Sequence, residues 1–178
     1  SSNFFLIFKY KLNSKDVLNR YFLPIKKGFT IFPTIAFKTN IYSVFWGCKA
    51  SQKYLKDTSG SLINISSIAG KRGSKNNSVY VSTKFAMNGI TQSLSKELGN
   101  KKIRVNAICP VLIKTDGLLK ALSKKSAPGY ENIDFFLDNF QETQTALNRL
   151  PSINDVAQMV LFLASTNASS ITGQCINV

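Results

Sequence analysis

Tyr80 and Lys84 are four residues apart, and Ser67 lies 13 residues before the tyrosine. On a helix, positions i and i+4 lie one turn apart on one face, so the Lys84 ammonium can lie near the Tyr80 phenol. A nearby cation favours the phenolate and pulls the tyrosine pKa down from about 10, toward the range of a general acid/base. A Ser67 hydroxyl brought close by the fold would hydrogen-bond the same substrate oxygen. These residue types predict a proton-transfer site in a chain that has no histidine.

A Tyr-x-x-x-Lys pair alone is most often a surface pair on a helix, so the surrounding sequence decides its meaning. The run GSLINISSIAG spans Gly60–Gly70 and precedes the YVSTK of Tyr80–Lys84, and Asn40 lies 27 residues before Ser67. Further along, IRVNAICP spans Ile103–Pro110, and Thr115 follows it. Near the end stand RLP at 149–151, DVA at 155–157, FLAS at 162–165 and ITGQ at 171–174.

These ordered motifs, over about 140 residues, resemble the active-site region of the short-chain dehydrogenases/reductases. Members of that family are NAD(P)-dependent oxidoreductases with a Ser-Tyr-Lys site and a supporting Asn. The resemblance implies that Tyr80 exchanges a proton with the substrate oxygen while hydride moves between nicotinamide and carbon. It also implies that Lys84 lowers the phenol pKa and binds the nicotinamide ribose, that Ser67 orients the substrate oxygen, and that Asn40 holds a water.

The same resemblance implies a cofactor, a substrate class and partners. Ser67 and Tyr80 would contact a small-molecule alcohol or carbonyl, and the full-length protein would form a homo-oligomer, either a dimer or a tetramer. The cofactor is NAD or NADP, which the sequence does not distinguish. The expected cofactor contacts are Tyr80, Lys84, Pro110, Ile113 and Thr115.

Two departures from the family pattern leave an alternative open. Val111 replaces the glycine that usually follows the proline, and no G-x-x-x-G-x-G turn occurs anywhere in the chain. A dinucleotide needs backbone N–H groups at a helix N-terminus for its pyrophosphate. The alternative is therefore a catalytically inactive, truncated fragment of this family that acts at most through subunit contacts.

The order of elements predicts an α/β fold. A buried strand is expected at 61–65, a loop at 70–78, a helix from about Val79 that stops at Gly99, and a strand at 103–108. A helix is also expected from Asn40 to about Leu55, and a capping box at 152–155 opens the last helix. This alternation favours a Rossmann-like parallel sheet flanked by helices, with the N-terminal glycine-rich half missing or unrecognisable.

The chain divides into an unassigned segment at 1–38 and a family-like catalytic portion at 39–178, which is expected to be incomplete at both ends. Residues 116–148 would cover the substrate. Aromatic side chains in that stretch could line an apolar pocket, although packing is the favoured interpretation. They are Tyr130, Phe135, Phe136 and Phe140.

The formal net charge of +14 is spread along the chain without long basic runs. A solvated surface is therefore favoured over a nucleic-acid-binding module, which stays the weakest alternative. Three distant cysteines and the absence of histidine indicate no metal site and a reducing, cytoplasmic compartment. The apolar run at 4–8 is too short to span a membrane, because Lys9 ends it.

Overall fold

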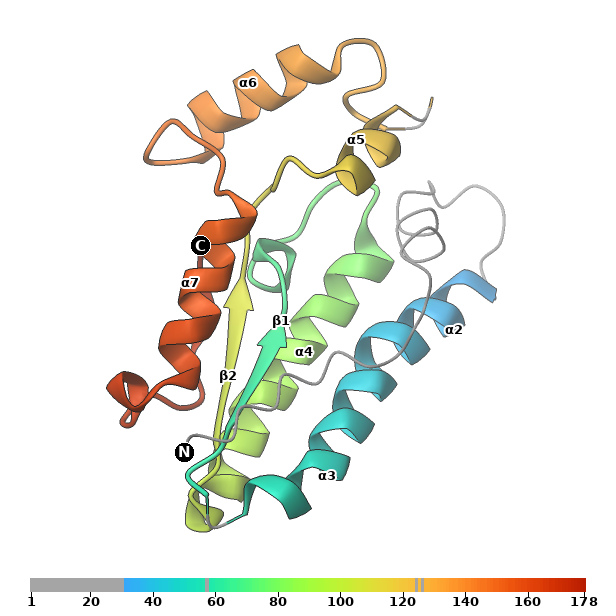
Figure 1. Cartoon of the computed structure of the whole chain (residues 1–178). Helices are drawn as coiled ribbons and strands as arrows, with labels where there is room; N and C mark the ends of the chain where they lie inside the picture. Colours follow the sequence, from blue (N-terminus) through green and yellow to red (C-terminus); the bar gives the residue numbers. More distant parts are fainter. Residues whose placement is uncertain (1–30, 57, 124, 126) are drawn as a thin grey trace.

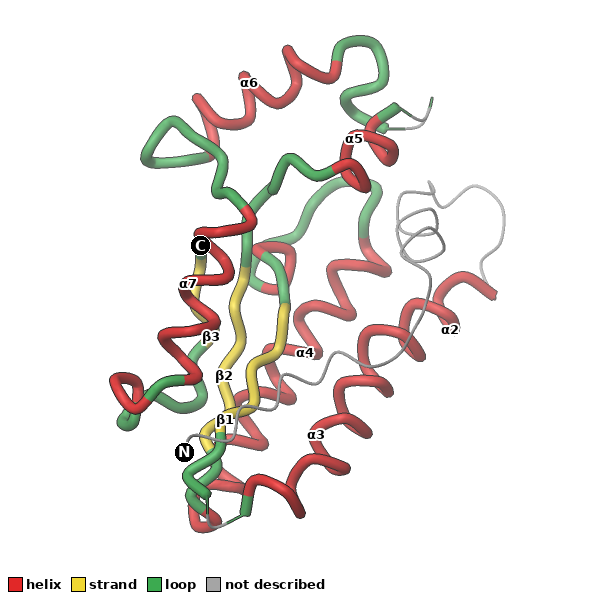
Figure 2. Tube along the Cα trace, viewed as in Figure 1, coloured by secondary structure: helices red, strands yellow, loops and turns green. Residues whose placement is uncertain are grey.

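Among the described residues, three parallel strands form a sheet in the order β1-β2-β3 (β1 and β2 are labelled in Figure 1, and all three in Figure 2). The computed structural model describes residues 31–178 apart from 57, 124 and 126, so most of the segment at 1–38 lies outside the described residues. Strand β1 is Ser61–Ile65, β2 is Arg104–Cys109 and β3 is Cys175–Asn177. Ile65 pairs with Ile108, and Ala107 pairs with Cys175. The prediction of a parallel α/β sheet is confirmed.

Helices cover both faces of this sheet (Figures 1 and 2). Helix α7 (Ile153–Ala164) contacts β1 and β2 on one side, and α3 (Ser43–Leu55) and α4 (Ser78–Leu98) contact the strands on the other. Each interface has its own apolar core. The core under α3 and α4 contains Cys48, Leu55, Leu62, Leu94, Leu98, Ile103 and Val105. The core under α7 is centred on Ile108, Leu163 and Ala168.

Helix α4 follows the bounds that the sequence predicts, since it ends immediately before Gly99. Its buried face contains polar residues as well as leucine and methionine. The polar groups here have hydrogen-bond partners: the Asn64 amide donates to Thr91 Oγ1 at 2.9 Å, and Thr91 donates to the Met87 carbonyl at 2.9 Å. No buried side-chain nitrogen or oxygen among the described residues lacks a hydrogen bond.

The helix that contains Asn40 extends further toward the N-terminus than expected. It runs through α2 (Ile31–Phe37), a π-helical segment η1 (Lys38–Tyr42) and α3 without a break. The prediction that this helix begins at Asn40 is wrong, because the apolar residues before Asn40 continue it and Pro33 lies within its first described turn, where proline is tolerated. Asn40 therefore lies in the interior of a long helix.

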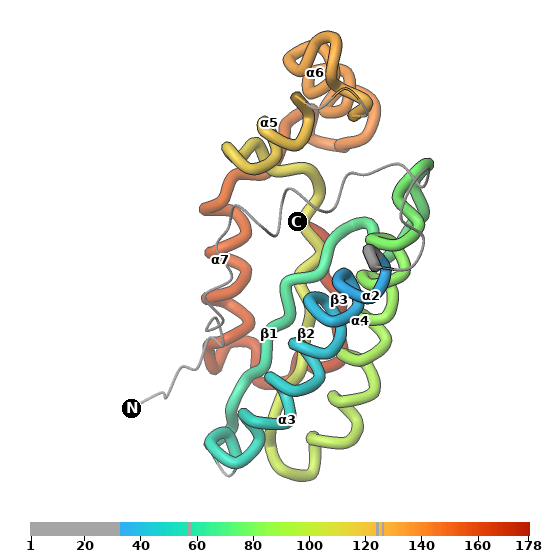
Figure 3. The backbone as a smooth tube through the Cα atoms, turned by 90° about the vertical axis from the view of Figure 1, so that its right-hand side faces the viewer, coloured from blue at the N-terminus to red at the C-terminus, as the bar shows by residue number. Residues whose placement is uncertain are grey.

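Two short helices lie beyond the carboxyl ends of the strands, α5 (Asp116–Leu122) and α6 (Ile133–Gln144) (Figure 3). Leu122, Ala127 and Leu137 form a separate small core there, with Phe136 packed against it. Phe135 is 69% exposed, so the aromatic residues of this stretch are divided between packing and the surface.

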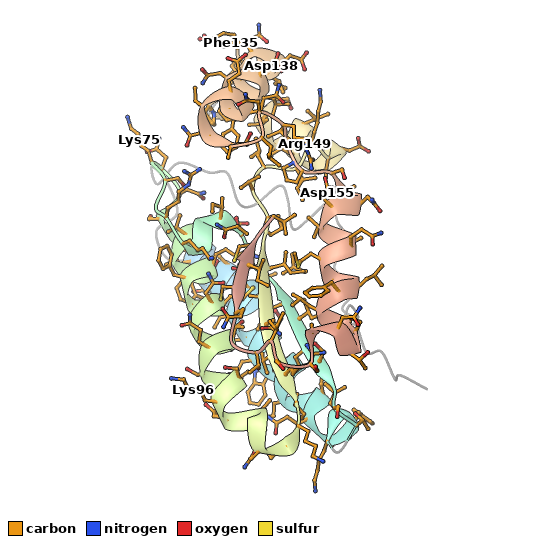
Figure 4. All side chains as sticks on the ribbon, turned by 90° about the vertical axis from the view of Figure 1, so that its left-hand side faces the viewer. Lys75, Lys96, Phe135, Asp138, Arg149 and Asp155 are labelled. Carbon is orange, nitrogen blue, oxygen red and sulfur yellow. The ribbon has the colours of Figure 1, made fainter. Side chains whose placement is uncertain are left out.

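The start of α7 carries the predicted capping box. The Ser152 hydroxyl accepts from the Asp155 N–H, and the Asp155 carboxylate accepts from the Ser152 N–H. Arg149 pairs with the same carboxylate at 3.1 Å, and Figure 4 shows both charged residues together at this end of the helix. These hydrogen bonds lower the pKa of Asp155 to about 2.

None of the helices in the described part of the chain has the length and apolar character needed to cross a bilayer.

Candidate active site

The predicted site residues gather at the carboxyl ends of β1 and β2, which point toward α5 and α6 (Figure 1). Ser67 lies two residues after the last residue of β1, and Pro110 directly follows β2. Helix α4 passes beside these ends and contributes Tyr80 and Lys84. In open parallel sheets, ligands bind in this position, outside the carboxyl ends of the strands.

Lys84 is a buried amine that faces the ring of Tyr80. Its Nζ lies 5.6 Å from the centre of the Tyr80 ring and donates a hydrogen bond to the Ile65 carbonyl at 2.9 Å. The residue is only 8% exposed. Burial lowers the pKa of Lys84 to about 8, and the electrostatic effect of Cys109 opposes this shift in part. At neutral pH the amine is still mostly charged, and it loses its proton in mildly alkaline solution.

Ser67 stands in extended backbone at the start of a single 3-10 turn, η2 (Ile68–Gly70). Its hydroxyl oxygen accepts from the Ala69 N–H at 3.1 Å, which caps that turn. The backbone around it is fixed to β2, because the Ile68 N–H donates to the Pro110 carbonyl at 2.9 Å. The Ser67 side chain therefore has a rigid support just beyond β1.

The turn η2 approaches α4 closely, and glycine at position 70 makes this possible. A Cβ at Gly70 would lie 2.7 Å from the Lys84 carbonyl oxygen and 2.7 Å from the Asn88 side-chain nitrogen. Asn88 donates to the Gly70 carbonyl at 2.9 Å and lies 3.7 Å from the Cys109 sulfur. Asn88 thus joins η2, α4 and β2 behind the site.

Asn40 reaches α4 from the π-helical segment η1. Its side-chain amide donates to Thr83 Oγ1 at 2.9 Å, one residue before Lys84. Thr83 is fully buried and donates its own hydroxyl hydrogen to the Tyr80 carbonyl at 2.7 Å. The structure therefore brings Asn40, Tyr80 and Lys84 to one end of α4.

The sequence did not single out Thr83 or Asn88 as site residues. The signal that could have found them is the presence of polar residues on the apolar, sheet-facing side of α4, where burial demands a specific partner. Both residues lie within one turn of Lys84 on that side.

The segment after β2 adopts ordinary backbone conformations. Val111 does not have a positive φ, so a valine at this position needs no strained backbone. Its N–H donates to the Val178 carbonyl at 2.9 Å. Ile113 is partly buried. Thr115 caps α5, since its hydroxyl accepts from the Leu118 N–H at 3.2 Å.

The chemistry of these donors fits the nicotinamide end of a dinucleotide. A buried ammonium, a phenol and two serine or threonine hydroxyls lie around the ends of β1 and β2, next to the backbone of 110–115. A glycine-rich turn between a strand and a helix, which would hold the pyrophosphate end, does not occur in the printed sequence. No group of three or more Cys, Asp or Glu residues that could hold a metal occurs within the described residues.

Comparison with known proteins identifies the class. The sequence model of the family described as enoyl-(acyl carrier protein) reductase matches residues 33–178. With the parallel sheet and the serine, tyrosine and lysine at its carboxyl end, this match places the chain in the short-chain dehydrogenase/reductase family.

Two groups of relatives are similar to this chain. A 3-oxoacyl-[acyl-carrier-protein] reductase of Chlamydia muridarum is 38% identical over 141 residues, which cover 79% of this chain and 52% of that protein. A diacetyl reductase [(S)-acetoin forming] of Staphylococcus aureus is 33% identical over 156 residues, covering 83% of this chain and 57% of that protein. The chain thus spans about half the length of these relatives.

Solved structures agree with this family. A short-chain type dehydrogenase/reductase from Mycobacterium ulcerans matches with a TM-score of 0.74 and 32% identity, over 87% of this chain and 53% of that chain. ElxO with NADP bound matches with a TM-score of 0.73 and 29% identity, over 87% of this chain and 59% of that chain.

Proposed function

We propose that this chain carries the catalytic site of an NAD(P)-dependent oxidoreductase that interconverts an alcohol and a carbonyl, with Tyr80 as the general acid/base. The observation that carries the proposal is the buried Lys84 amine, 5.6 Å from the centre of the Tyr80 ring. A buried amine that has no carboxylate partner among the described residues is costly, and such perturbed groups cluster at functional sites. The family of the chain supports the same reaction class.

Each residue of the site has a defined task in this proposal. Lys84, while charged, stabilises the phenolate form of Tyr80, so the phenol gives up a proton to the carbonyl oxygen during reduction and takes it back during oxidation. Ser67 orients that oxygen through a hydrogen bond. Asn40 holds a water near Lys84, through which the proton exchanges with solvent.

The cofactor would be NAD or NADP, whose bound nicotinamide exchanges a hydride with the substrate carbon. Tyr80, Lys84, Pro110, Ile113 and Thr115 would hold the nicotinamide end. The reaction is balanced, because reduction of the carbonyl consumes one hydride at carbon and one proton from Tyr80 at oxygen.

The substrate class is a small ketone or a 3-oxoacyl thioester. The names of the two relatives support this choice, since one reduces a 3-oxoacyl group and the other diacetyl. Both substrates carry a ketone beside a second carbonyl. The residues of α5 and α6, which lie beyond the strand ends, would decide between them.

The proposal is tested with Tyr80→Phe in the protein that carries this chain. Reduction of diacetyl and of a 3-oxoacyl thioester by NADH or NADPH should fall by ~10² to 10⁴, the usual contribution of general acid/base catalysis. Tyr54→Phe is the matched control, because Tyr54 is 59% exposed on α3 and the same oxygen is removed there. Near wild-type turnover in the Tyr80 variant would remove this residue from the mechanism.

A second candidate is a catalytically inactive member of the family. The observation that favours it is the absence of a glycine-rich turn from the printed sequence. On this ground, we expect the 178-residue chain by itself to bind nicotinamide dinucleotide poorly. Titration with NADH and NADPH by calorimetry measures this directly, and saturable binding at micromolar cofactor would contradict it.

The proposal also includes a homo-oligomer in the cytoplasm. Phe45 and Trp46 are 47% and 58% exposed on α3, and aromatic side chains are enriched at protein interfaces. The three cysteines are free, as expected in a reducing compartment. Light scattering of the purified protein determines the oligomeric state, and a monomer at micromolar concentration would refute this part.

A further inference from the structure

We propose that Thr83 is a positioning residue, whose hydroxyl holds the Asn40 side chain at the Tyr80–Lys84 end of helix α4. The catalytic consequence of this inference rests on the proposed function. The structural part, that one buried hydroxyl fixes Asn40, stands independently of any reaction.

The Thr83 hydroxyl uses both its donor and an acceptor site. Its hydrogen goes to the Tyr80 carbonyl at 2.7 Å, and its oxygen accepts from the Asn40 amide at 2.9 Å. Thr83 is 0% exposed, so water cannot replace either partner. One hydroxyl therefore links the side chain of Asn40 to the backbone of Tyr80.

Asn40 lies in an unusual part of its helix. Residues 38–42 form a π-helical turn, in which the Ser43 N–H donates to the Lys38 carbonyl five residues earlier. Such turns are rare and occur mostly as single turns within α-helices at functional sites. The Ser43 hydroxyl also bonds to the Thr39 carbonyl, and η1 contacts α4. The π-helical turn and the hydrogen bond to Thr83 together define where Asn40 lies.

Thr83 also lies between the two reactive residues along α4. It follows Tyr80 by three residues and precedes Lys84 directly, and all three belong to the first two turns of the helix. A shift of Asn40 away from Thr83 therefore changes its position relative to both reactive groups. No aliphatic side chain can replace the hydroxyl in this role.

The structural part is tested on the 178-residue chain labelled with nitrogen-15. Thr83→Val keeps the shape but removes the hydroxyl, and the side-chain amide resonances of Asn40 should move to the shifts and hydrogen-exchange rates of an exposed asparagine. Thr83→Ser should leave these resonances close to wild type. Thr91→Val is the matched control, because Thr91 is also 0% exposed on α4 but accepts from Asn64. It should shift the Asn64 resonances and leave those of Asn40 in place.

Thr83→Ala provides a second variant without the hydroxyl if the valine methyl group disturbs packing. Unchanged Asn40 resonances in either folded variant would overturn the proposal. Loss of the fold in both variants, while Thr91→Val folds, would also overturn it, because Thr83 would then be needed for the fold itself and not for the position of Asn40.

The catalytic part is tested by a double-mutant cycle in the protein that carries this chain. Thr83→Val should lower kcat about tenfold, the effect of losing one buried hydrogen bond, with little change in KM. In an Asn40→Ala background it should have no further effect on kcat, because the group it positions is gone. Independent, additive losses would contradict the inference. Absence of carbonyl reduction in the wild type would refute the proposed function instead, while the resonance measurement still decides the structural part.

Discussion

Helices α4 and α7 pack on opposite faces of the same sheet, but they use different chemistry to do so. The buried side of α4 carries polar groups among its apolar ones, and four of them have a partner in η1, β1 or η2: Thr83, Lys84, Asn88 and Thr91. The buried centre of α7 is apolar, built around Leu163. Helix α7 also leaves Ile153 and Leu161 66% and 54% exposed.

The two faces of the sheet therefore contribute differently: the α4 face positions polar groups, and the α7 face buries apolar surface. A buried polar group stabilises the fold only when its partner is in place, so the α4 side specifies positions as well as packing. The α7 side contributes through the removal of apolar surface from water, which depends little on direction. We therefore expect substitutions under α7 to change stability alone, and substitutions under α4 to change stability together with proton affinity or geometry at the site.

The largest effect on stability is expected for Leu163→Ala. Leu163 is 0% exposed at the centre of the α7 core, so the variant should lose about 2 to 5 kcal/mol of unfolding free energy. Denaturant unfolding measures this loss. The pH dependence of stability should keep its wild-type shape, and a changed pH dependence would mean that the two faces are coupled.

Lys84→Met should remove the part of the pH dependence of the unfolding free energy that comes from the buried amine on α4. The pKa of Lys84 is about 8 in the folded chain, against an ordinary value of 10.5. Between these values the unfolded chain binds more protons, so the free energy of unfolding should rise with pH in the wild type, by about 3 kcal/mol in total. The cost of burying the cation is fully present below pH 8 and absent above pH 10.5.

Denaturant unfolding at a series of pH values gives the free energy of unfolding of wild type and of Lys84→Met. The difference between these two free energies at each pH isolates the contribution of Lys84, because the other titrating groups are common to both proteins. A constant difference across the whole range would show that Lys84 has an ordinary pKa.

Gly70→Ala is expected to cost about 1 to 3 kcal/mol through overpacking, because the added methyl group would lie 2.7 Å from the Lys84 carbonyl oxygen. Gly73→Ala is the matched control three residues away, since nothing lies within 4 Å of a Cβ there. Thermal unfolding of both variants measures the contrast. Equal stabilities would show that η2 moves away from α4 at little cost.

Local sequence pattern predicts the regular elements well. The strand at 61–65, the end of α4 before Gly99 and the capping box at Ser152 are confirmed, because each depends on neighbours in the sequence. The predicted parallel sheet is also confirmed, because alternating strands and helices allow few other arrangements. The family is confirmed from ordered motifs rather than from any single residue.

The features that the sequence did not predict depend on contacts between residues that are distant along the chain. Asn40, in the π-helical turn, donates a hydrogen bond to Thr83, which lies 43 residues away in the sequence. The close approach of Gly70 to Asn88 likewise joins segments 18 residues apart. A local pattern carries no record of such pairs, so the sequence placed Asn40 at a helix start and did not distinguish Thr83 or Asn88 from other residues of α4. The roles of Asn40, Ser67, Tyr80 and Lys84 stay predictions.

The most direct test of the account is the titration of Lys84 itself. The chain is labelled with carbon-13 at the lysine side chains, and the resonance of Lys84 is assigned by its loss in Lys84→Met. Burial at the end of β1 predicts that this resonance titrates near pH 8, well below the ordinary lysine value of 10.5. A midpoint near 10.5, together with the exposed lysines, would contradict the burial of the Lys84 amine at the end of β1, which is the observation that carries the proposed function.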